Sequence, residues 1–276
     1  MKTRIITAAV LLLILVPVLI FSNTFLYVVF ASLLTLIASL EMLGCMRLVK
    51  RLDLTLPTVI YSVVTVSLSR AFGSDAAFMK LFVSLTFVYI FLIFTLSLFA
   101  DEDKRAQLPE IMLAASAIIY ITFGFATFVT VRDAVNGVFL FPLAYIAAWV
   151  SDTGAYFTGV KFGKTKLIPE ISPKKTVEGF FGGLISCVIV FAIYSIFVGA
   201  LSNVKPNYFW IIVCAVILSV ASVAGDLIAS MIKRKYKIKD YSHLFPGHGG
   251  VLDRFDSIIA TTALLYILSS IVPLFK

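Results

Sequence analysis

Residues 179–204 read GFFGGLISCVIVFAIYSIFVGALSNV and contain no charged side chain. A helix needs about 20 apolar residues to cross a bilayer, so this stretch is long enough to span one. The chain has seven more stretches without a charged residue: 5–40, 54–69, 81–100, 111–131, 134–151, 206–225 and 257–275. Of the 276 residues, 61% are hydrophobic and only 14% are charged, unlike a soluble domain. The sequence therefore predicts an all-α, polytopic integral membrane protein.

The N-terminal stretch sets the number of crossings. Residues 5–40 are too many for one helix, and Ser22-Asn23-Thr24 supplies a turn near their middle, so we count nine transmembrane helices. Lys2 and Arg4 precede the first apolar run, but no small-x-small cleavage site follows it. We therefore expect the first helix to be retained.

The basic residues are unevenly distributed, and this predicts the orientation. With the N-terminus in the cytoplasm, 18 of the 23 lysines and arginines fall in cytoplasmic segments. Such an excess is typical of cytoplasmic loops. We therefore predict a multi-pass protein of the cell inner (cytoplasmic) membrane. Its two richest polar loops, 152–178 and 226–256, would face the cytoplasm, although topology alone could also explain their lysines.

The composition disfavours several classes of function. Two histidines and three scattered cysteines show no metal-ligand spacing, which argues against a zinc site. The net charge of +8 is explained by the cytoplasmic loops and anionic lipid, so we expect no nucleic-acid partner. Because polar groups concentrate in the second half, we divide the chain into a transmembrane scaffold (1–131) and a C-terminal transmembrane catalytic region with two basic loops (132–276).

Three carboxylates are candidate metal ligands. Asp226 follows twenty uncharged residues, at a depth where a carboxylate usually faces a polar cavity, an ion or a partner. Asp253 and Asp256 lie one helical turn apart and would repel each other unless a cation lay between them. Such oxygen ligands suit Mg²⁺, and a second cation is left open. Two alternatives do not require a metal. Asp226 could form a salt bridge to a loop lysine, and Asp253 and Asp256 could simply complement the dipole at the N-terminus of their helix.

Two segments are suited to phosphate binding. The turn Pro246-Gly247-His248-Gly249-Gly250 exposes backbone N–H groups at a helix start, but it lacks the lysine and hydroxyl of a Walker A loop. Ser172-Pro173-Lys174-Lys175 is predicted to open the seventh helix, where N–H and ammonium groups would bind an anion. Asp152 is expected to end the sixth helix and to cap the next segment or line the site. Glu178 complements the helix dipole or pairs with the lysines.

The polar block before the last helix resembles a known signature. Residues 230–256 read SMIKRKYKIKDYSHLFPGHGGVLDRFD. They are similar to the signature of the phosphatidate cytidylyltransferase (CDP-diacylglycerol synthase) family, with no departure from it. The matching positions are Ser230, Ile232, Lys233, Arg234, Lys239, Asp240, Ser242, Phe245, Pro246, His248, Gly249, Gly250, Asp253, Arg254 and Asp256. Residues 152–156, 172–179 and 225–226 also resemble the family.

The resemblance implies that CTP and phosphatidic acid give CDP-diacylglycerol and diphosphate, with Mg²⁺, in phospholipid biosynthesis. CTP, phosphatidic acid and membrane lipid are the expected partners, and a homodimer is left open. We assign the metal to Asp226, Asp253 and Asp256. The expected catalytic residues are Lys233, Arg234, Lys239, His248 and Arg254, with a structural turn as the alternative role of the histidine. The expected substrate-binding residues are Asp152, Ser172, Lys174, Lys175, Thr176, Glu178, Gly249 and Gly250.

The lipid substrate constrains the site. Each buried CH₂ of an acyl chain contributes about 0.8 kcal/mol, so phosphatidate stays in the bilayer and its head group must reach the metal. We therefore expect Asp226, Asp253 and Asp256 to converge in a cavity among helices six to nine, open to the cytoplasm and to the inner leaflet.

Two other classes of function remain open. A lipid-alcohol kinase that uses CTP would need a base for the hydroxyl and would release CDP. A transporter would keep Asp226 as an ion site, but it has no use for two basic loops beside a glycine turn.

The predicted orientation can be tested by cysteine labelling in intact cells. A membrane-impermeant maleimide should not reach Lys164→Cys or Lys237→Cys until the cells are permeabilised, because both positions belong to the cytoplasmic loops. Lys205→Cys should react from outside. Labelling of Lys237→Cys from outside would overturn the orientation.

Overall fold

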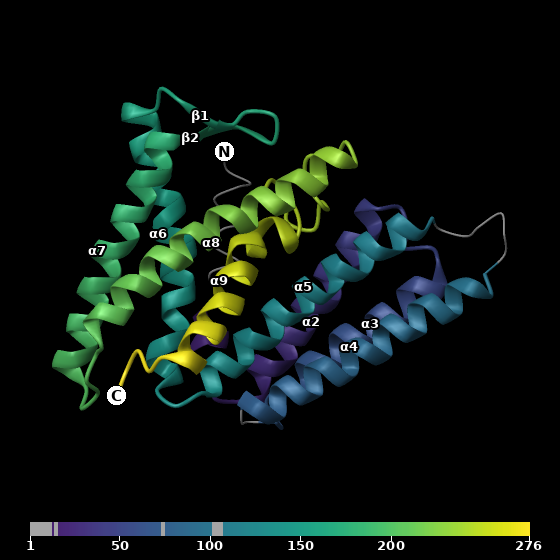
Figure 1. The fold of residues 1–276 in the computed structure, drawn as a ribbon, viewed down its shortest axis with the longest axis horizontal. Helices are drawn as coiled ribbons and strands as arrows, with labels where there is room; N and C mark the ends of the chain where they lie inside the picture. The colour runs from purple at the N-terminus through teal and green to yellow at the C-terminus, as the bar shows by residue number, and fades with distance from the viewer. Residues whose placement is uncertain (1–12, 14–15, 73–74, 101–106) are drawn as a thin grey trace. The chain divides into compact units, whose positions relative to one another are not determined.

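The computed structural model describes residues 13, 16–72, 75–100 and 107–276, and it is built mainly of long helices (Figure 1). Their bounds are α2 (Phe25–Cys45), α3 (Leu52–Ser69), α4 (Asp75–Leu98), α5 (Leu108–Asp133), α6 (Gly137–Phe162), α7 (Val177–Leu201), α8 (Tyr208–Lys235) and α9 (Leu252–Ile271). All eight are long and apolar enough to cross a membrane. A polytopic membrane protein is therefore confirmed. The first predicted crossing lies largely outside the described residues, so the count of nine stays a prediction.

The predicted turn ahead of α2 is present. The Thr24 N–H donates to the Phe21 carbonyl at 2.9 Å, and the Thr24 hydroxyl donates to the same oxygen at 2.7 Å. Helix α2 begins directly afterwards, at Phe25. A small polar side chain that bonds to nearby backbone favours such a turn over a continuing helix.

The chain divides into two compact units. Unit 1 comprises Met1–Asp133 and Tyr236–Arg254, and unit 2 comprises Ala134–Lys235 and Phe255–Lys276. The first break falls close to the boundary predicted at 131/132. The signature segment after α8, however, groups with the N-terminal helices, which the sequence-based division did not foresee.

Unit 1 contains α2 to α5, which pack against one another through apolar and aromatic side chains. Tyr27 of α2 stacks on Phe128 of α5 with ring centroids 5.2 Å apart, and its hydroxyl donates to the Phe128 carbonyl. Tyr61 of α3 stacks on Tyr89 of α4 at 4.4 Å. Aromatic pairs of this kind contribute about 0.5–1.5 kcal/mol beyond their buried area.

Unit 2 contains α6 to α8 and the part of α9 from Phe255 onward, with α6 and α7 packed side by side along much of their length. Polar side chains join the buried faces: the Ser151 hydroxyl donates to Ser219 at 2.9 Å, and the Thr261 hydroxyl donates to the Ala144 carbonyl at 3.1 Å. The outer face of α7 is apolar, with Phe181, Ile185, Ile189 and Ile193 all exposed. An exposed apolar stripe at this spacing suits contact with lipid.

A short β-hairpin joins α6 to α7 and corrects one prediction. Strands β1 (Lys166–Ile168) and β2 (Ser172–Thr176) pair antiparallel. Ser172-Pro173-Lys174-Lys175 therefore lies in a strand and does not open the seventh helix. Proline biases the preceding residue towards extended backbone. The helix starts only after Thr176, whose hydroxyl caps it by accepting the Gly179 N–H at 3.1 Å.

Two helices run further than their charge-free stretches. Helix α6 continues past Asp152 to Phe162, so the prediction that Asp152 ends the helix is wrong. Helix α8 continues past Asp226 to Lys235, and its last turn carries Lys233, Arg234 and Lys235. A charged residue does not stop a helix, since the backbone hydrogen bonds can continue through it. Asp152 and Asp226 therefore lie within helices, and not at helix ends.

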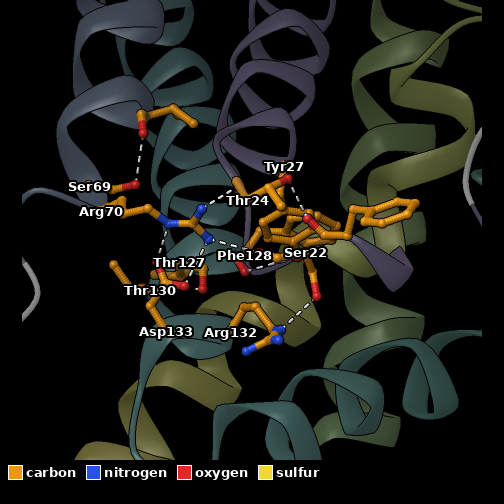
Figure 2. Close-up of polar contacts among 12 residues, drawn as sticks. Ser22, Thr24, Tyr27, Ser69, Arg70, Thr127, Phe128, Thr130, Arg132 and Asp133 are labelled. Carbon is orange, nitrogen blue, oxygen red and sulfur yellow. Dashed lines mark hydrogen bonds and ion pairs between the residues drawn. The ribbon is translucent and has the colours of Figure 1, made fainter. Parts of the chain in front are cut away.

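A polar cluster centred on Arg70 connects three segments of unit 1 (Figure 2). The guanidinium donates to both carboxylate oxygens of Asp133, at 2.6 and 2.8 Å, from the end of α3 to the end of α5. It also donates to the carbonyls of Ser22 and Thr24 in the turn before α2. Arg132 donates to the Ser22 hydroxyl at 2.7 Å. One side chain thus holds the ends of two helices to the start of a third.

Replacement of Arg70 should destabilise unit 1. Arg70→Gln removes a bidentate ion pair and two charge-assisted hydrogen bonds, and we expect a loss of about 1–3 kcal/mol after allowance for partial exposure. Thermal unfolding in detergent measures it. The matched control is Lys80→Gln on α4, an exposed position, which should leave the unfolding temperature unchanged. Equal effects of the two variants would contradict the proposed role of Arg70 in holding the three helix ends together.

Candidate active site

A cavity of about 400 Å³ lies in unit 2, where α6, the β-hairpin and the start of α7 meet. Its charged lining comprises Asp152, Lys166, Lys174 and Lys175. Thr176, Tyr156 and Phe180 add a hydroxyl and two aromatic rings, and Val223 of α8 contributes to the wall. Three ammonium groups against one carboxylate make the cavity suitable for an anion, and the rings offer flat apolar surfaces.

The predicted substrate-binding residues of this region separate into two groups. Asp152, Lys174, Lys175 and Thr176 line the cavity together. Glu178 instead accepts the backbone N–H groups of Lys164 and Thr165 at 3.1 Å each. Its carboxylate thereby holds the segment before β1 against the first turn of α7. Ser172 lies at the start of β2 and is not among the lining residues.

Asp226 forms an ion pair with a cavity lysine. Lys175 Nζ lies 2.6 Å from Asp226 Oδ2, and both side chains are about a quarter exposed. The salt bridge that was the alternative interpretation of Asp226 is therefore present. It occupies one carboxylate oxygen, whereas within the described part of the chain Oδ1 accepts a long hydrogen bond of 3.4 Å from the Ser230 hydroxyl. The second oxygen retains the capacity to bind a cation.

Asp256 lies among further charges of unit 2. Its charged neighbours are Asp226, Lys233 and Asp152, and Lys233 is a buried lysine, 8% exposed. Asp152 in turn interacts with Lys175 and Asp226. The cluster thus brings together three carboxyl groups and two lysine side chains. Carboxylate oxygens in such surroundings attract a hard divalent cation.

The donors fit Mg²⁺ in type. Among the described residues, no three acidic, histidine or cysteine side chains are grouped closely enough to hold a metal by themselves. Mg²⁺ is usually bound by one or two carboxylates together with water and substrate phosphates. Asp226 and Asp256 meet that need, and the convergence of all three carboxylates stays a prediction.

Asp253 organises the signature turn within unit 1. Its Oδ2 accepts the backbone N–H groups of Tyr241, at 2.8 Å, and of Gly250, at 2.9 Å. Gly249 adopts φ of 79°, and a Cβ there would lie 2.6 Å from the same oxygen. A residue with a side chain would be strained at this position and would displace the carboxylate. The Gly250 N–H, predicted to bind phosphate, is engaged by Asp253.

The remaining predicted residues lie in or beside the signature. His248 donates its backbone N–H to the Phe245 carbonyl, and its buried Nδ1 has no hydrogen-bond partner among the described residues. Arg234 Nε donates to the Ile171 carbonyl, in the hairpin turn, at 3.5 Å. Lys239 and Arg254 are exposed. The histidine is thus held by its backbone, while the two cations are open to solvent.

Sequence reasoning missed several residues. Lys166, Tyr156 and Phe180 line the cavity, but none of them was among the predicted site residues, although Tyr156 lies in the stretch 152–156 that resembles the family. Glu41, in α2, is buried and accepts hydrogen bonds from the signature segment. A signal existed for Glu41, because it is a lone carboxylate directly after the charge-free stretch 5–40.

These features define an integral membrane protein with a cavity lined by lysines and with carboxylates of a type suited to a divalent cation. A model of the cytidylyltransferase family matches residues 2–272, and the chain belongs to this family. Its curated relatives include proteins named phosphatidate cytidylyltransferase from Staphylococcus haemolyticus and Staphylococcus epidermidis, each 34% identical over 268 residues. The relative of that name from Staphylococcus aureus is 34% identical over 271 residues. Each alignment covers 97% of this chain and 98% of the relative.

The cavity should bind an inorganic polyanion through Lys175. Lys175→Met removes a cation and leaves the Asp226 charge uncompensated, so we expect the affinity for diphosphate to fall about 10- to 100-fold. Isothermal titration calorimetry on the detergent-purified protein measures this change. Lys161→Met is the matched control, because Lys161 is exposed near the end of α6 and lies over the Phe162 ring. An unchanged affinity in Lys175→Met would contradict the assignment.

Proposed function

We propose that this protein transfers the cytidylyl group of CTP to phosphatidate, giving CDP-diacylglycerol and diphosphate. The observation that carries the proposal is the pairing of Lys175 with Asp226 beside a basic cavity built on membrane-spanning helices. Membership of the cytidylyltransferase family and the names of the relatives support the reaction class and the substrates.

The reaction balances without a redox partner. An oxygen of the phosphatidate phosphate attacks the α-phosphorus of CTP, and the bond from that phosphorus to the bridging oxygen of the β-phosphate breaks. Diphosphate leaves with the bridging oxygen. A phosphate monoester is already ionised near pH 7, since its second pKa is about 6, so no strong general base is required.

The barrier lies chiefly in bringing two anions together, and the cavity lysines address it. Lys166, Lys174 and Lys175 would contact the phosphates of the nucleotide, while Thr176 offers a hydroxyl and Tyr156 and Phe180 offer ring faces. Fixed cations that contact phosphate oxygens stabilise the charge that develops in the transition state. We assign diphosphate departure to this basic side of the cavity.

Asp226 and Asp256 would hold Mg²⁺. Asp253 lies one helical turn before Asp256 on α9. Bound Mg²⁺ would neutralise phosphate charge and orient the reacting groups. Lys175 has two possible partners in this scheme, the Asp226 carboxylate and a substrate phosphate. An incoming phosphate would draw the lysine away and release Asp226 Oδ2 for the cation. The ion pair thus keeps two groups with opposite roles close together before substrate binds.

We further propose that the site opens to the cytoplasm. The excess of lysine and arginine in the hairpin and the signature segment supports this orientation. CTP would enter from water, while phosphatidate would present its head group from the inner leaflet.

The position of a radioactive phosphate in CTP distinguishes cytidylyl transfer from phosphorylation of a lipid alcohol. With CTP labelled at the α-phosphate, cytidylyl transfer places the label in a cytidine-containing lipid and releases unlabelled diphosphate. A kinase would place label in lipid only from γ-labelled CTP. Liposomes containing phosphatidate, purified protein and Mg²⁺ are sufficient for the assay. Label in the lipid from γ-labelled CTP alone would overturn the proposal.

Neutralising either carboxylate should strongly lower turnover while preserving the fold. We expect Asp226→Asn and Asp256→Asn each to lower kcat by at least about 10²-fold, a typical loss for one charge-stabilising contact, and to raise the Mg²⁺ concentration for half-maximal rate. Steady-state assays across a Mg²⁺ series measure both. The control is Glu170→Gln, at an exposed carboxylate of the hairpin turn. Near-normal turnover with unchanged Mg²⁺ dependence in Asp226→Asn would disprove its role.

A further inference from the structure

Glu41 is a buried carboxylate of α2 whose hydrogen-bond partners, among the described residues, lie in the signature segment. Only 7% of the residue is exposed to solvent. Oε1 accepts the Ser242 hydroxyl at 2.6 Å and the Val251 N–H at 3.0 Å, and Oε2 accepts the Leu252 N–H at 2.8 Å. All four residues belong to unit 1.

These contacts explain how the charge can be buried. A carboxylate removed from water is strongly destabilising unless hydrogen bonds or a cation compensate it. Glu41 receives three hydrogen bonds, two of them from amides at the N-terminus of α9, where the helix dipole also favours negative charge. The Leu252 N–H belongs to the first residue of α9 and cannot bond within the helix. Glu41 and the start of α9 therefore satisfy each other.

The glycine at position 250 is shaped by the same carboxylate. A Cβ built on Gly250 would lie closest to Glu41 Oε1, and the three atoms nearest to it all belong to the Glu41 carboxylate. Any side chain at this position would push the carboxylate away from the Val251 and Leu252 amides. The glycine at position 250 of the signature is thus required by Glu41, a residue about 200 positions earlier in the chain.

Two carboxylates divide three consecutive backbone amides between them. The Gly250 N–H donates to Asp253, whereas the Val251 and Leu252 N–H groups donate to Glu41. The segment that precedes α9 is therefore held from both sides. Asp253 is the second residue of that helix, and its orientation depends on where the helix begins.

We propose that Glu41 is a positioning residue for the reaction: it fixes the start of α9 and thereby the orientation of Asp253. The inference rests on the proposed function. Glu41 does not contact substrate in this scheme. It acts through the Val251 and Leu252 amides, and supporting groups of this kind typically change metal affinity or activity by about 10- to 100-fold when they are altered.

The test is Glu41→Gln in the full-length protein in detergent. The amide NH₂ would face the Leu252 N–H, donor against donor, while the other two hydrogen bonds can persist. We expect kcat to fall about 10- to 100-fold and the Mg²⁺ requirement to rise, with KM for CTP nearly unchanged. Hydrogen–deuterium exchange supplies a readout independent of activity, because amides within residues 241–252 should exchange faster while α3 to α5 keep their protection.

Two further variants keep the inference falsifiable if Glu41→Gln folds poorly. Gly250→Ala retains Glu41 but occupies the space of its carboxylate, so it should reproduce the kinetic and exchange changes. Ser39→Ala is the matched control on α2, since Ser39 is fully buried and its hydroxyl has no hydrogen-bond partner among the described residues. It should behave as the unmodified protein does.

The outcomes are separable. An unmodified protein that forms no cytidine-containing lipid would overturn the proposed function itself. An active unmodified protein with normal kcat, Mg²⁺ requirement and local exchange in both Glu41→Gln and Gly250→Ala would overturn the positioning role alone. Faster exchange throughout unit 1, with loss of activity in proportion to unfolding, would show that Glu41 only stabilises the fold and would likewise overturn the role.

Discussion

A charged side chain among membrane-spanning helices needs a partner, and this constraint shapes both units. Apolar surroundings cannot solvate a carboxylate, so each one must find a cation, hydrogen-bond donors or a polar cavity. Asp226 has Lys175, and Glu41 has one hydroxyl and two amides. The partners come from the hairpin and the signature segment, which are the polar parts of an otherwise apolar chain. Compensating the buried charge therefore also fixes the position of those polar segments.

The two carboxylates are compensated in different ways, and the difference matches their proposed roles. Lys175 and Asp226 are each about a quarter exposed, so their ion pair remains within reach of water and can exchange partners. Glu41 is almost fully buried and is bonded by backbone amides, which cannot move without moving the helix. An exchangeable pair suits a group that must bind a substrate phosphate or a cation during turnover. A fixed cap suits a group that only holds the site in place.

The resemblance to the family supplied Asp152, Lys174, Lys175 and Thr176 as substrate-binding residues. Local sequence predicted the membrane-spanning stretches, from their apolar length, and the turn at residues 22–24. It did not predict where helices stop, because α6 runs past Asp152 to a terminus set by later residues. It also missed the hairpin and Glu41. Their partners lie far away in sequence, and hydropathy and periodicity describe only neighbours along the chain.

The signature turn shows the same limit in one short segment. From sequence, its glycines indicate a turn whose exposed backbone N–H groups could bind phosphate. In the structure, each of two glycines leaves space for a different carboxylate: Gly249 for Asp253, and Gly250 for Glu41. The Gly250 N–H is bonded to Asp253, and the next two amides are bonded to Glu41. Part of the glycine-rich pattern is therefore explained by the approach of acidic side chains, so the phosphate contacts of the proposed reaction depend chiefly on the lysines of the hairpin.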